Sequence, residues 1–223
     1  MLFVFPVLCI ALAITFMYVE YKKQYVPAVC LKGMASLCFV LFGILSGKLC
    51  GDQEFSKLVI IGLILGFVAD ILLNLRFVFE KKGQIIFLVG IVVFLAGHIF
   101  YLAALIPHSS NLVASLIAGI VLTAITLYLI FKKITAKPAF KIFGVFYIGA
   151  IMLMTCVSVG ILISNLSAHS VIFSLGAVSF LISDIVLILN TFGSKTKQSL
   201  RVTNLSLYYI GQLLIGLRLQ FLK

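Results

Sequence analysis

The 223-residue chain is 63% hydrophobic and only 10% charged, with a mean hydropathy of +1.28. A soluble domain of this size needs more charged residues on its surface, so these values exclude an ordinary globular protein and indicate an integral membrane protein. The formal net charge of +11 would suit nucleic-acid binding. However, the basic residues stand in short connections between apolar runs, which indicates contact with membrane lipids and no nucleic acid.

Eight apolar segments follow one another along the chain, each near the roughly 20 residues that cross the hydrocarbon core. They cover residues 2–19, 27–46, 57–75, 84–106, 111–131, 140–164, 169–190 and 200–222. The connections between them are too short to hold a soluble domain. We therefore expect an all-α integral membrane protein with eight transmembrane helices, forming a single membrane domain with a multi-pass location in the cell membrane.

The basic residues predict how the chain is oriented in the membrane. The connections after the first, third, fifth and seventh segments carry most of the 17 Lys and Arg residues. The residues concerned are Lys22, Lys23, Arg76, Lys81, Lys82, Lys132, Lys133, Lys137, Lys141, Lys195, Lys197 and Arg201. The positive-inside rule places these connections in the cytoplasm and both termini outside.

The stretch from Gly62 to Asn74 reads GLILGFVADILLN and carries a carboxylate, Asp70, near the middle of an apolar segment. Gly62, Gly66, Asp70 and Asn74 are spaced by four residues, so they share one face of a helix. Small residues on that face let a neighbouring helix approach closely. A carboxylate in hydrocarbon costs on the order of 3 kcal/mol, so its presence there indicates a function.

The pattern returns as GAVSFLISDIVLILN, in which Asp184 corresponds to Asp70 (184 − 70 = 114). His98 and Gln212 are separated by the same 114 residues, and each follows a glycine. Four segments separate equivalent positions, and because four is even, the two copies run in the same direction through the membrane. We therefore predict two parallel four-helix repeats, approximately residues 1–108 and 109–223.

Polar residues from several segments fall in or near one band of membrane depth. With a rise of about 1.5 Å per residue, Asp70 and Asp184 both lie in the cytoplasmic half of the membrane. The candidates for substrate binding near this band are Lys32, Asn74, His98, Tyr101, Tyr147, Ser183, Tyr209 and Gln212. The sequence predicts depth but not direction around each helix, so contact between these residues stays open.

Each candidate also has a purely structural interpretation. The aspartates could form a structural pair between helices, Lys32 could extend to the membrane interface, and His98 could be a core histidine. The amide and hydroxyl residues could join helices by hydrogen bonds. The tyrosines could serve packing alone, which is the favoured interpretation for Tyr208.

Metal and serine chemistry are disfavoured. His108 and His169 fall in or beside external connections, and no HExxH, cysteine pair or GxSxG stretch occurs. We therefore expect neither a metal nor another cofactor. If both aspartates line one pocket, their repulsion in a low dielectric should hold one protonated and the other ionised. That arrangement suits general acid–base catalysis and equally suits proton-coupled transport.

Several short motifs, taken in order, resemble the YhhN-like family of membrane proteins, whose characterised animal members are lysoplasmalogenases. The motifs are Lys32 early in the second segment, GFVAD ending at Asp70, FLAGHIFYLA with His98 and Tyr101, FYIGAIMLM with Tyr147, FLISD ending at Asp184, and YYIGQ ending at Gln212. The resemblance implies a hydrolase that cleaves the vinyl ether bond of a lysophospholipid within the bilayer, giving a fatty aldehyde and a glycerophospho-alcohol.

Asp70 and Asp184 would then be the catalytic acid–base pair, and Lys32 would meet the substrate phosphate. Two other classes stay open. A proton- or ion-coupled transporter also uses parallel repeats and intramembrane acids, although neither aspartate-bearing segment contains proline. A non-catalytic lipid-binding or scaffold protein is the third possibility. The sequence does not determine the oligomeric state.

Overall fold

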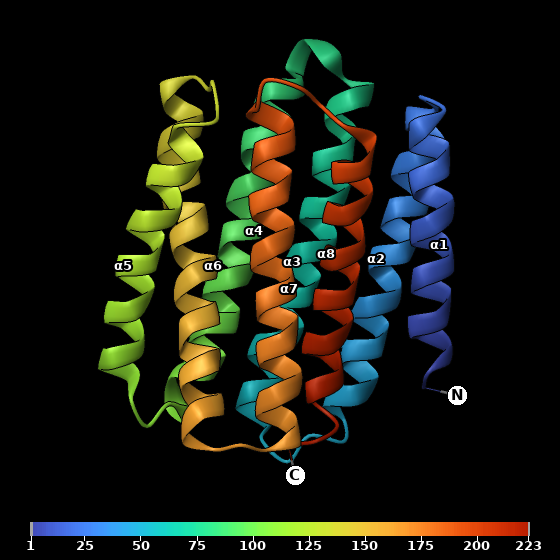
Figure 1. The fold of residues 1–223 in the computed structure, drawn as a ribbon. Helices are drawn as coiled ribbons and strands as arrows, with labels where there is room; N and C mark the ends of the chain where they lie inside the picture. Colours follow the sequence, from blue (N-terminus) through green and yellow to red (C-terminus); the bar gives the residue numbers. More distant parts are fainter. Residues whose placement is uncertain (1, 223) are drawn as a thin grey trace.

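The structure, a computed structural model, describes residues 2–222 as a bundle of α-helices with two short 3₁₀ turns (Figure 1). The helices are α1 (Val4–Tyr21), α2 (Tyr25–Gly47), α3 (Gln53–Val78), α4 (Gly83–Leu105), α5 (Leu112–Phe131), α6 (Pro138–Ser164), α7 (Ala168–Phe192) and α8 (Gln198–Arg218). The 3₁₀ turns are η1 (Glu80–Lys82) and η2 (Ile106–His108). The predicted fold class, an all-α membrane protein, is confirmed.

Every predicted segment corresponds to one helix, and no boundary differs by more than four residues. The largest differences are the start of α3 and the end of α8. The α3 helix begins at Gln53 because the Asp52 side chain accepts a hydrogen bond from the Phe55 amide at 2.9 Å. Such an N-cap can start a helix several residues before the apolar stretch begins. A hydropathy pattern does not detect this start.

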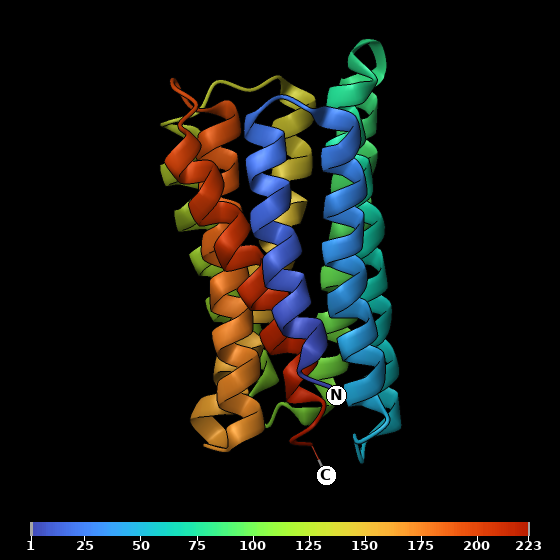
Figure 2. The ribbon, with the colours of Figure 1, turned by 90° about the vertical axis from the view of Figure 1, so that its right-hand side faces the viewer.

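Among the helices within residues 2–222, seven are long and apolar enough to cross a membrane, and α8 is not one of them. Nevertheless, α8 runs beside α7 through the bundle in both views (Figures 1 and 2). Its most polar residues, Asn204, Gln212 and Arg218, are buried. Because they face other helices instead of lipid, the low hydropathy of α8 is compatible with its place inside the bundle.

The helices of each predicted repeat pack in chain order, α1 to α4 and then α5 to α8. The two halves meet where α2 packs on α8 and where α4 packs on α6. Under the 114-residue offset, α2 corresponds to α6 and α4 to α8. The two junctions are therefore equivalent, as two parallel repeats would require.

Two glycine pairs mark close approaches between helices. A Cβ atom on Gly97 of α4 would lie 3.2 Å from the carbonyl oxygen of Gly62 in α3. A Cβ atom on Gly211 of α8 would lie 3.0 Å from the carbonyl oxygen of Gly176 in α7. Both glycines of the second pair follow those of the first by 114 residues. The same close contact thus occurs in each predicted repeat.

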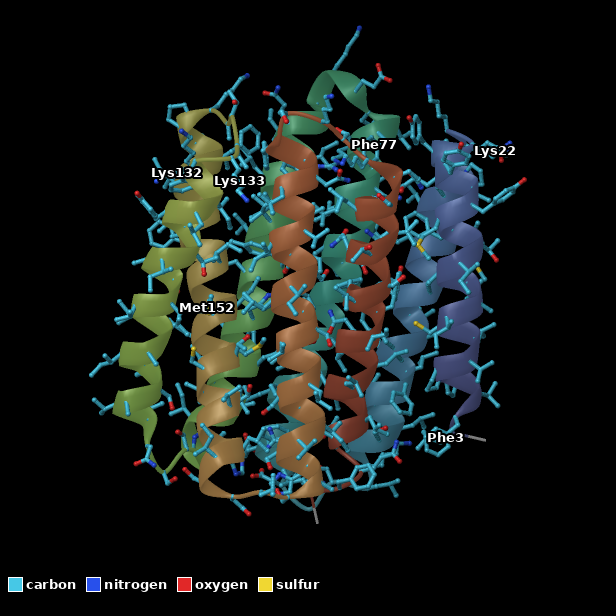
Figure 3. All side chains as sticks on the ribbon, viewed as in Figure 1. Phe3, Lys22, Phe77, Lys132, Lys133 and Met152 are labelled. Carbon is cyan, nitrogen blue, oxygen red and sulfur yellow. The ribbon has the colours of Figure 1, made fainter. Side chains whose placement is uncertain are left out.

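The start of α1 and the end of α8 lie at the same end of the bundle (Figures 1 and 2). Lys22, Lys132 and Lys133 lie at the opposite end, as Figure 3 shows. We call this opposite end, with its connections 22–24, 79–82, 132–137 and 193–197, the basic end. The positive-inside rule predicts that the basic end faces the cytoplasm.

Candidate functional site

Asp70 lies where α2, α3 and α8 meet, and only 1% of its surface is exposed. Its Oδ1 atom lies 3.0 Å from Nζ of Lys32. Its Oδ2 atom accepts hydrogen bonds from Ser36 Oγ at 2.5 Å and from Tyr208 OH at 2.6 Å. Lys32 and Ser36 are four residues apart on α2, so both point to the same face of that helix. Asp70 therefore has the full set of partners that an ionised carboxylate needs in a buried position.

Lys32 is buried with Asp70, with 3% of its surface exposed. Its ammonium donates to Oδ1 of Asn74 at 3.4 Å and stands 5.6 Å from the centre of the Phe16 ring. A buried ammonium is tolerated only with a counter-charge and further polar or aromatic contacts. These contacts hold Lys32 against α3 and away from the membrane interface.

Asp184 of α7 is almost as buried, with 3% of its surface exposed, but its surroundings differ. Its Oδ2 atom accepts a hydrogen bond from Tyr147 OH of α6 at 2.7 Å. Among residues 2–222, Asp184 has no salt bridge and no second hydrogen bond to its side chain. The second aspartate thus lacks the nearby cation that the first one has.

Both aspartates line one pocket, which we call the polar pocket. Its walls come from α2, α3, α4, α6, α7 and α8. The lining residues are Lys32, Asp70, Leu73, Asn74, Arg76, Phe87, Phe94, Tyr147, Asp184, Leu187, Arg201, Asn204, Leu205 and Tyr208. The pocket therefore joins the two predicted repeats and reaches toward the basic end at Arg76 and Arg201.

The sequence model of the YhhN family matches residues 27–219, which is most of the chain. The chain belongs to the YhhN family. The matched range contains both aspartates and every other residue that lines the polar pocket. No curated protein and no solved structure matches the chain, so the chemistry of this YhhN protein has to be argued from its own pocket.

Several of the predicted site residues meet at the polar pocket. Lys32, Asn74 and Tyr147 line it together with the two aspartates. Asn74 also donates to Oε1 of Glu20 at 3.4 Å, which extends the polar contacts to α1.

Three further predicted residues, Tyr101, His98 and Gln212, lie farther from the basic end than Tyr208 does. Gln212 donates to the Tyr208 hydroxyl at 3.3 Å and accepts from the Tyr101 hydroxyl at 2.8 Å. His98 bonds through Nδ1 to the carbonyl oxygen of Phe94 at 2.8 Å and packs its ring against Phe180. A chain of hydrogen bonds therefore connects Tyr101 and Gln212 to Asp70, while His98 supports the aromatic wall.

The last two predicted residues do not line the polar pocket. Ser183 is paired with Asn204, since its hydroxyl donates to the Asn204 carbonyl and the Asn204 amide donates back. This pair connects α7 to α8. Tyr209 packs against the rings of Tyr208 and Phe39.

The sequence missed residues that the structure brings to the site. Ser36 was not a candidate, and Tyr208 was interpreted as a packing residue, yet both donate to Asp70. The signal for Ser36 was its position one turn after Lys32. For Tyr208 there was no such signal, because neighbouring tyrosines on a helix point in different directions and the sequence does not show which one faces Asp70.

A second pocket, which we call the apolar pocket, adjoins the polar one. The two share Leu73, Phe87, Phe94, Tyr147 and Leu187 as walls. Nearly all of the remaining lining is aliphatic or aromatic and comes from α4, α5, α6, α7 and the connection after α5. A polar and an apolar pocket thus lie next to each other.

Within residues 2–222, no group of three or more His, Cys, Asp and Glu side chains is placed to hold a metal ion. Lys32 and the tyrosines of the polar pocket are donors that suit an anion or a carboxylate. The pocket therefore offers proton donors and acceptors and the basic side chains of Lys32, Arg76 and Arg201 for chemistry on a polar group.

Proposed function

We propose that this YhhN-family protein is a membrane hydrolase that cleaves the vinyl ether bond of a lysoplasmalogen or related lysolipid ether. The products are a fatty aldehyde and a glycerophospho-alcohol. The observation that carries the proposal is the polar pocket, in which two buried carboxyl groups with different partners lie next to an apolar pocket.

The different partners support different roles for the two aspartates. Lys32 supplies a counter-charge beside the Asp70 carboxylate. Asp184 has no cation beside it and is contacted by one tyrosine hydroxyl. We therefore assign Asp184 as the proton donor and Asp70 as the group that stabilises positive charge.

The chemistry needs only a proton donor, a carboxylate and water. Asp184 protonates the alkene carbon farther from the ether oxygen, and the electron pair of the double bond forms the new C–H bond. The resulting oxocarbenium ion is stabilised by the negative charge of Asp70. Water adds to its carbon and loses a proton to a carboxylate, which gives a hemiacetal. Collapse of the hemiacetal returns a proton to the departing glycerol oxygen and releases the aldehyde.

The apolar pocket suits the hydrocarbon chain of such a substrate. Phe87, Phe94 and Tyr147 form walls of both pockets, so a chain lying in the apolar pocket would bring its first carbons to the two aspartates. The rest of the apolar lining would cover the tail, which would exchange the hydrocarbon of the bilayer for a protein surface of similar polarity.

The direct test is release of fatty aldehyde by purified protein given a 1-alkenyl lysophospholipid. We expect activity with the wild type and its loss in Asp70→Asn and Asp184→Asn. In D₂O, the aldehyde should gain one deuterium on the carbon next to the carbonyl, because that carbon receives the proton. A 1-alkyl lysophospholipid of the same length, which has no double bond to protonate, is the matched control substrate and should stay intact.

Full activity in both aspartate variants would contradict the mechanism. The proton- or ion-coupled transporter makes the opposite prediction, which is substrate-dependent proton flux into liposomes without product. The structure favours the hydrolase over the transporter because α3 and α7, which carry the aspartates, are continuous helices of 26 and 25 residues. Transport sites of that kind are typically formed by interrupted helices.

A further inference from the structure

Arg76 stands near the basic end of α3, one helical turn beyond Leu73 of the polar pocket. Its Nε atom is fully enclosed and has no hydrogen-bond partner within residues 2–222. The guanidinium stacks on two aromatic rings, 4.3 Å from the centre of Phe87 and 4.6 Å from that of Phe77. The rings hold the group in place and leave its remaining donors for another partner.

The other cations of the polar pocket are already paired. Lys32 is bound to Asp70, and Arg201 forms two hydrogen bonds with the carboxylate of Glu20, at 2.9 and 2.7 Å. None of the four salt bridges among residues 2–222 involves Arg76. In the described part of the polar pocket, Arg76 is therefore the cation without a protein carboxylate.

Arg76 also lies where three cavities meet. Besides the polar pocket, it lines two openings at the basic end, of which the one beside Glu20 and Arg201 is the larger. Lys23 lines the larger opening together with the Glu20–Arg201 pair. Glu80, an exposed residue, lines the smaller opening without forming a salt bridge to Arg76. A ligand that enters the polar pocket from the basic end thus passes the Arg76 guanidinium.

The spacing along α3 matches a lysophospholipid. Asp70 and Arg76 are six residues apart, which corresponds to about 9 Å along the helix axis. The glycerol unit of a lysophospholipid puts five bonds between its ether oxygen and its phosphorus, which is a shorter span, and the long arginine side chain can cover the difference. With the ether bond beside Asp70 and Asp184, the phosphate would reach the level of Arg76.

We infer that Arg76 is the binding residue for the phosphate of the lipid headgroup. A planar guanidinium binds two phosphate oxygens at once and is the side chain best suited to this contact. The inference takes the lipid class from the proposed function, but the site itself needs only a phosphate ester attached to a hydrocarbon chain. Arg76, not the internally paired Lys32, then meets the phosphate.

Binding of non-cleavable lipids tests this site separately from catalysis. The probes are a 1-alkyl lysophospholipid and the 1-alkylglycerol that lacks its phosphate, measured with purified protein in detergent micelles. Arg76→Gln should weaken binding of the phospholipid about tenfold or more, since a charge-assisted hydrogen bond is lost. Binding of the alkylglycerol should stay unchanged. Arg76→Lys should recover part of the lost affinity.

Lys82→Gln is the matched control, because it removes one positive charge from the same end of the bundle at an exposed residue of η1. It should leave the affinity for both lipids unchanged. Inorganic phosphate serves as competitor, and weak competition is expected if the hydrocarbon chain supplies much of the affinity. Competition by inorganic phosphate as strong as that by the phospholipid would assign the site to a free anion and overturn the lipid headgroup.

Two results would overturn the inference directly, which are unchanged phospholipid affinity in Arg76→Gln or an equal loss for both lipids. The thermal unfolding midpoint of each variant shows whether an equal loss comes from misfolding. If Arg76→Gln is misfolded, the comparison is made with Arg76→Lys instead. Phospholipid binding that depends on Arg76 without any aldehyde release would support the site and reject the proposed function. Aldehyde release that is unchanged in Arg76→Gln would support the proposed function and reject Arg76 as the phosphate-binding residue.

Discussion

The two aspartates occupy equivalent places in the predicted repeats, yet their surroundings differ in charge. Asp70 is held by the ammonium of Lys32 and the hydroxyls of Ser36 and Tyr208. Asp184 is held by a single tyrosine hydroxyl. Duplication of a helix bundle places a second carboxyl group in the membrane, but it does not by itself give the two groups different functions.

The difference comes from neighbours that do not match under the 114-residue offset. The positions that correspond to Lys32, Ser36 and Tyr208 carry the apolar residues Phe146, Ala150 and Phe94, and the position that corresponds to Tyr147 is Gly33. Each aspartate therefore has donors that the other lacks. Substitutions around one repeated residue thus give the two carboxyl groups different partners in the same pocket.

The largest expected effect is on the activity of Asp184→Asn. The amide has nearly the shape of the carboxyl group but cannot donate the required proton, so aldehyde release should fall about 100- to 10,000-fold. Because no cation faces Asp184, the thermal unfolding midpoint should change little. Binding of the 1-alkyl lysophospholipid should be retained. A variant that keeps most of its activity would break the assignment of the proton donor.

The second prediction concerns the stability of Asp70→Asn. Removal of this charge leaves the Lys32 ammonium buried without a counter-charge, which should destabilise the protein by about 3–5 kcal/mol. Activity should be lost as well. The measurement is reversible unfolding in mixed micelles, with Asp184→Asn as the comparison.

The double variant Lys32→Met, Asp70→Asn checks the physical cause of that destabilisation. Because both members of the ion pair are removed, much of the lost stability should return, while activity stays absent. A double variant as unstable as Asp70→Asn alone would show that the ion pair is not the cause.

A smaller effect should distinguish the two tyrosines. Tyr208→Phe removes one of three partners of Asp70, and Tyr147→Phe removes the single partner of Asp184. A hydrogen bond to a carboxyl group contributes about 1–3 kcal/mol. We expect Tyr147→Phe to lower kcat about tenfold with little loss of stability. Tyr208→Phe should chiefly lower stability, and the reverse pattern would contradict the assigned roles.

The smallest effect is expected for Tyr101→Phe, which breaks the hydrogen bond to Gln212 two contacts away from Asp70. A neutral hydrogen bond of this kind contributes about 1 kcal/mol, so activity should fall by less than about tenfold. Thr123→Val is the matched control, because the Thr123 hydroxyl bonds only within α5, to Gly119. If both substitutions lower activity equally, the hydrogen bond between Tyr101 and Gln212 has no specific role at Asp70.

The sequence predicted the bundle well because lipid imposes simple rules on length and charge. Apolar runs in the sequence located all eight helices, although α8 is less apolar than the other seven, and the spacing of the two aspartates indicated their equivalence. Local hydrogen bonds such as the Asp52 N-cap shifted the boundaries, since they do not depend on hydropathy. These are the parts of the structure that local sequence determines.

The composition of the pocket was less predictable, because it depends on the rotation of each helix about its axis. The choice of Tyr209 over Tyr208 shows this limit, since the two differ by one position and point to different neighbours. Arg76 shows another limit. It counted toward the charge of a connection, whereas the structure places it within α3 and against Phe87.

The polarity of α8 has a consequence for how the chain enters the bilayer during synthesis. A helix with Arg201, Asn204, Gln212 and Arg218 has little tendency to leave the translocon for lipid by itself. Its glycine face contacts α7 through Gly176 and Gly211, so we expect α7 and α8 to insert together as a helical hairpin. A chain that stops before residue 198 would leave Asp184 without the cover of α8, and quality-control proteases would be expected to remove it.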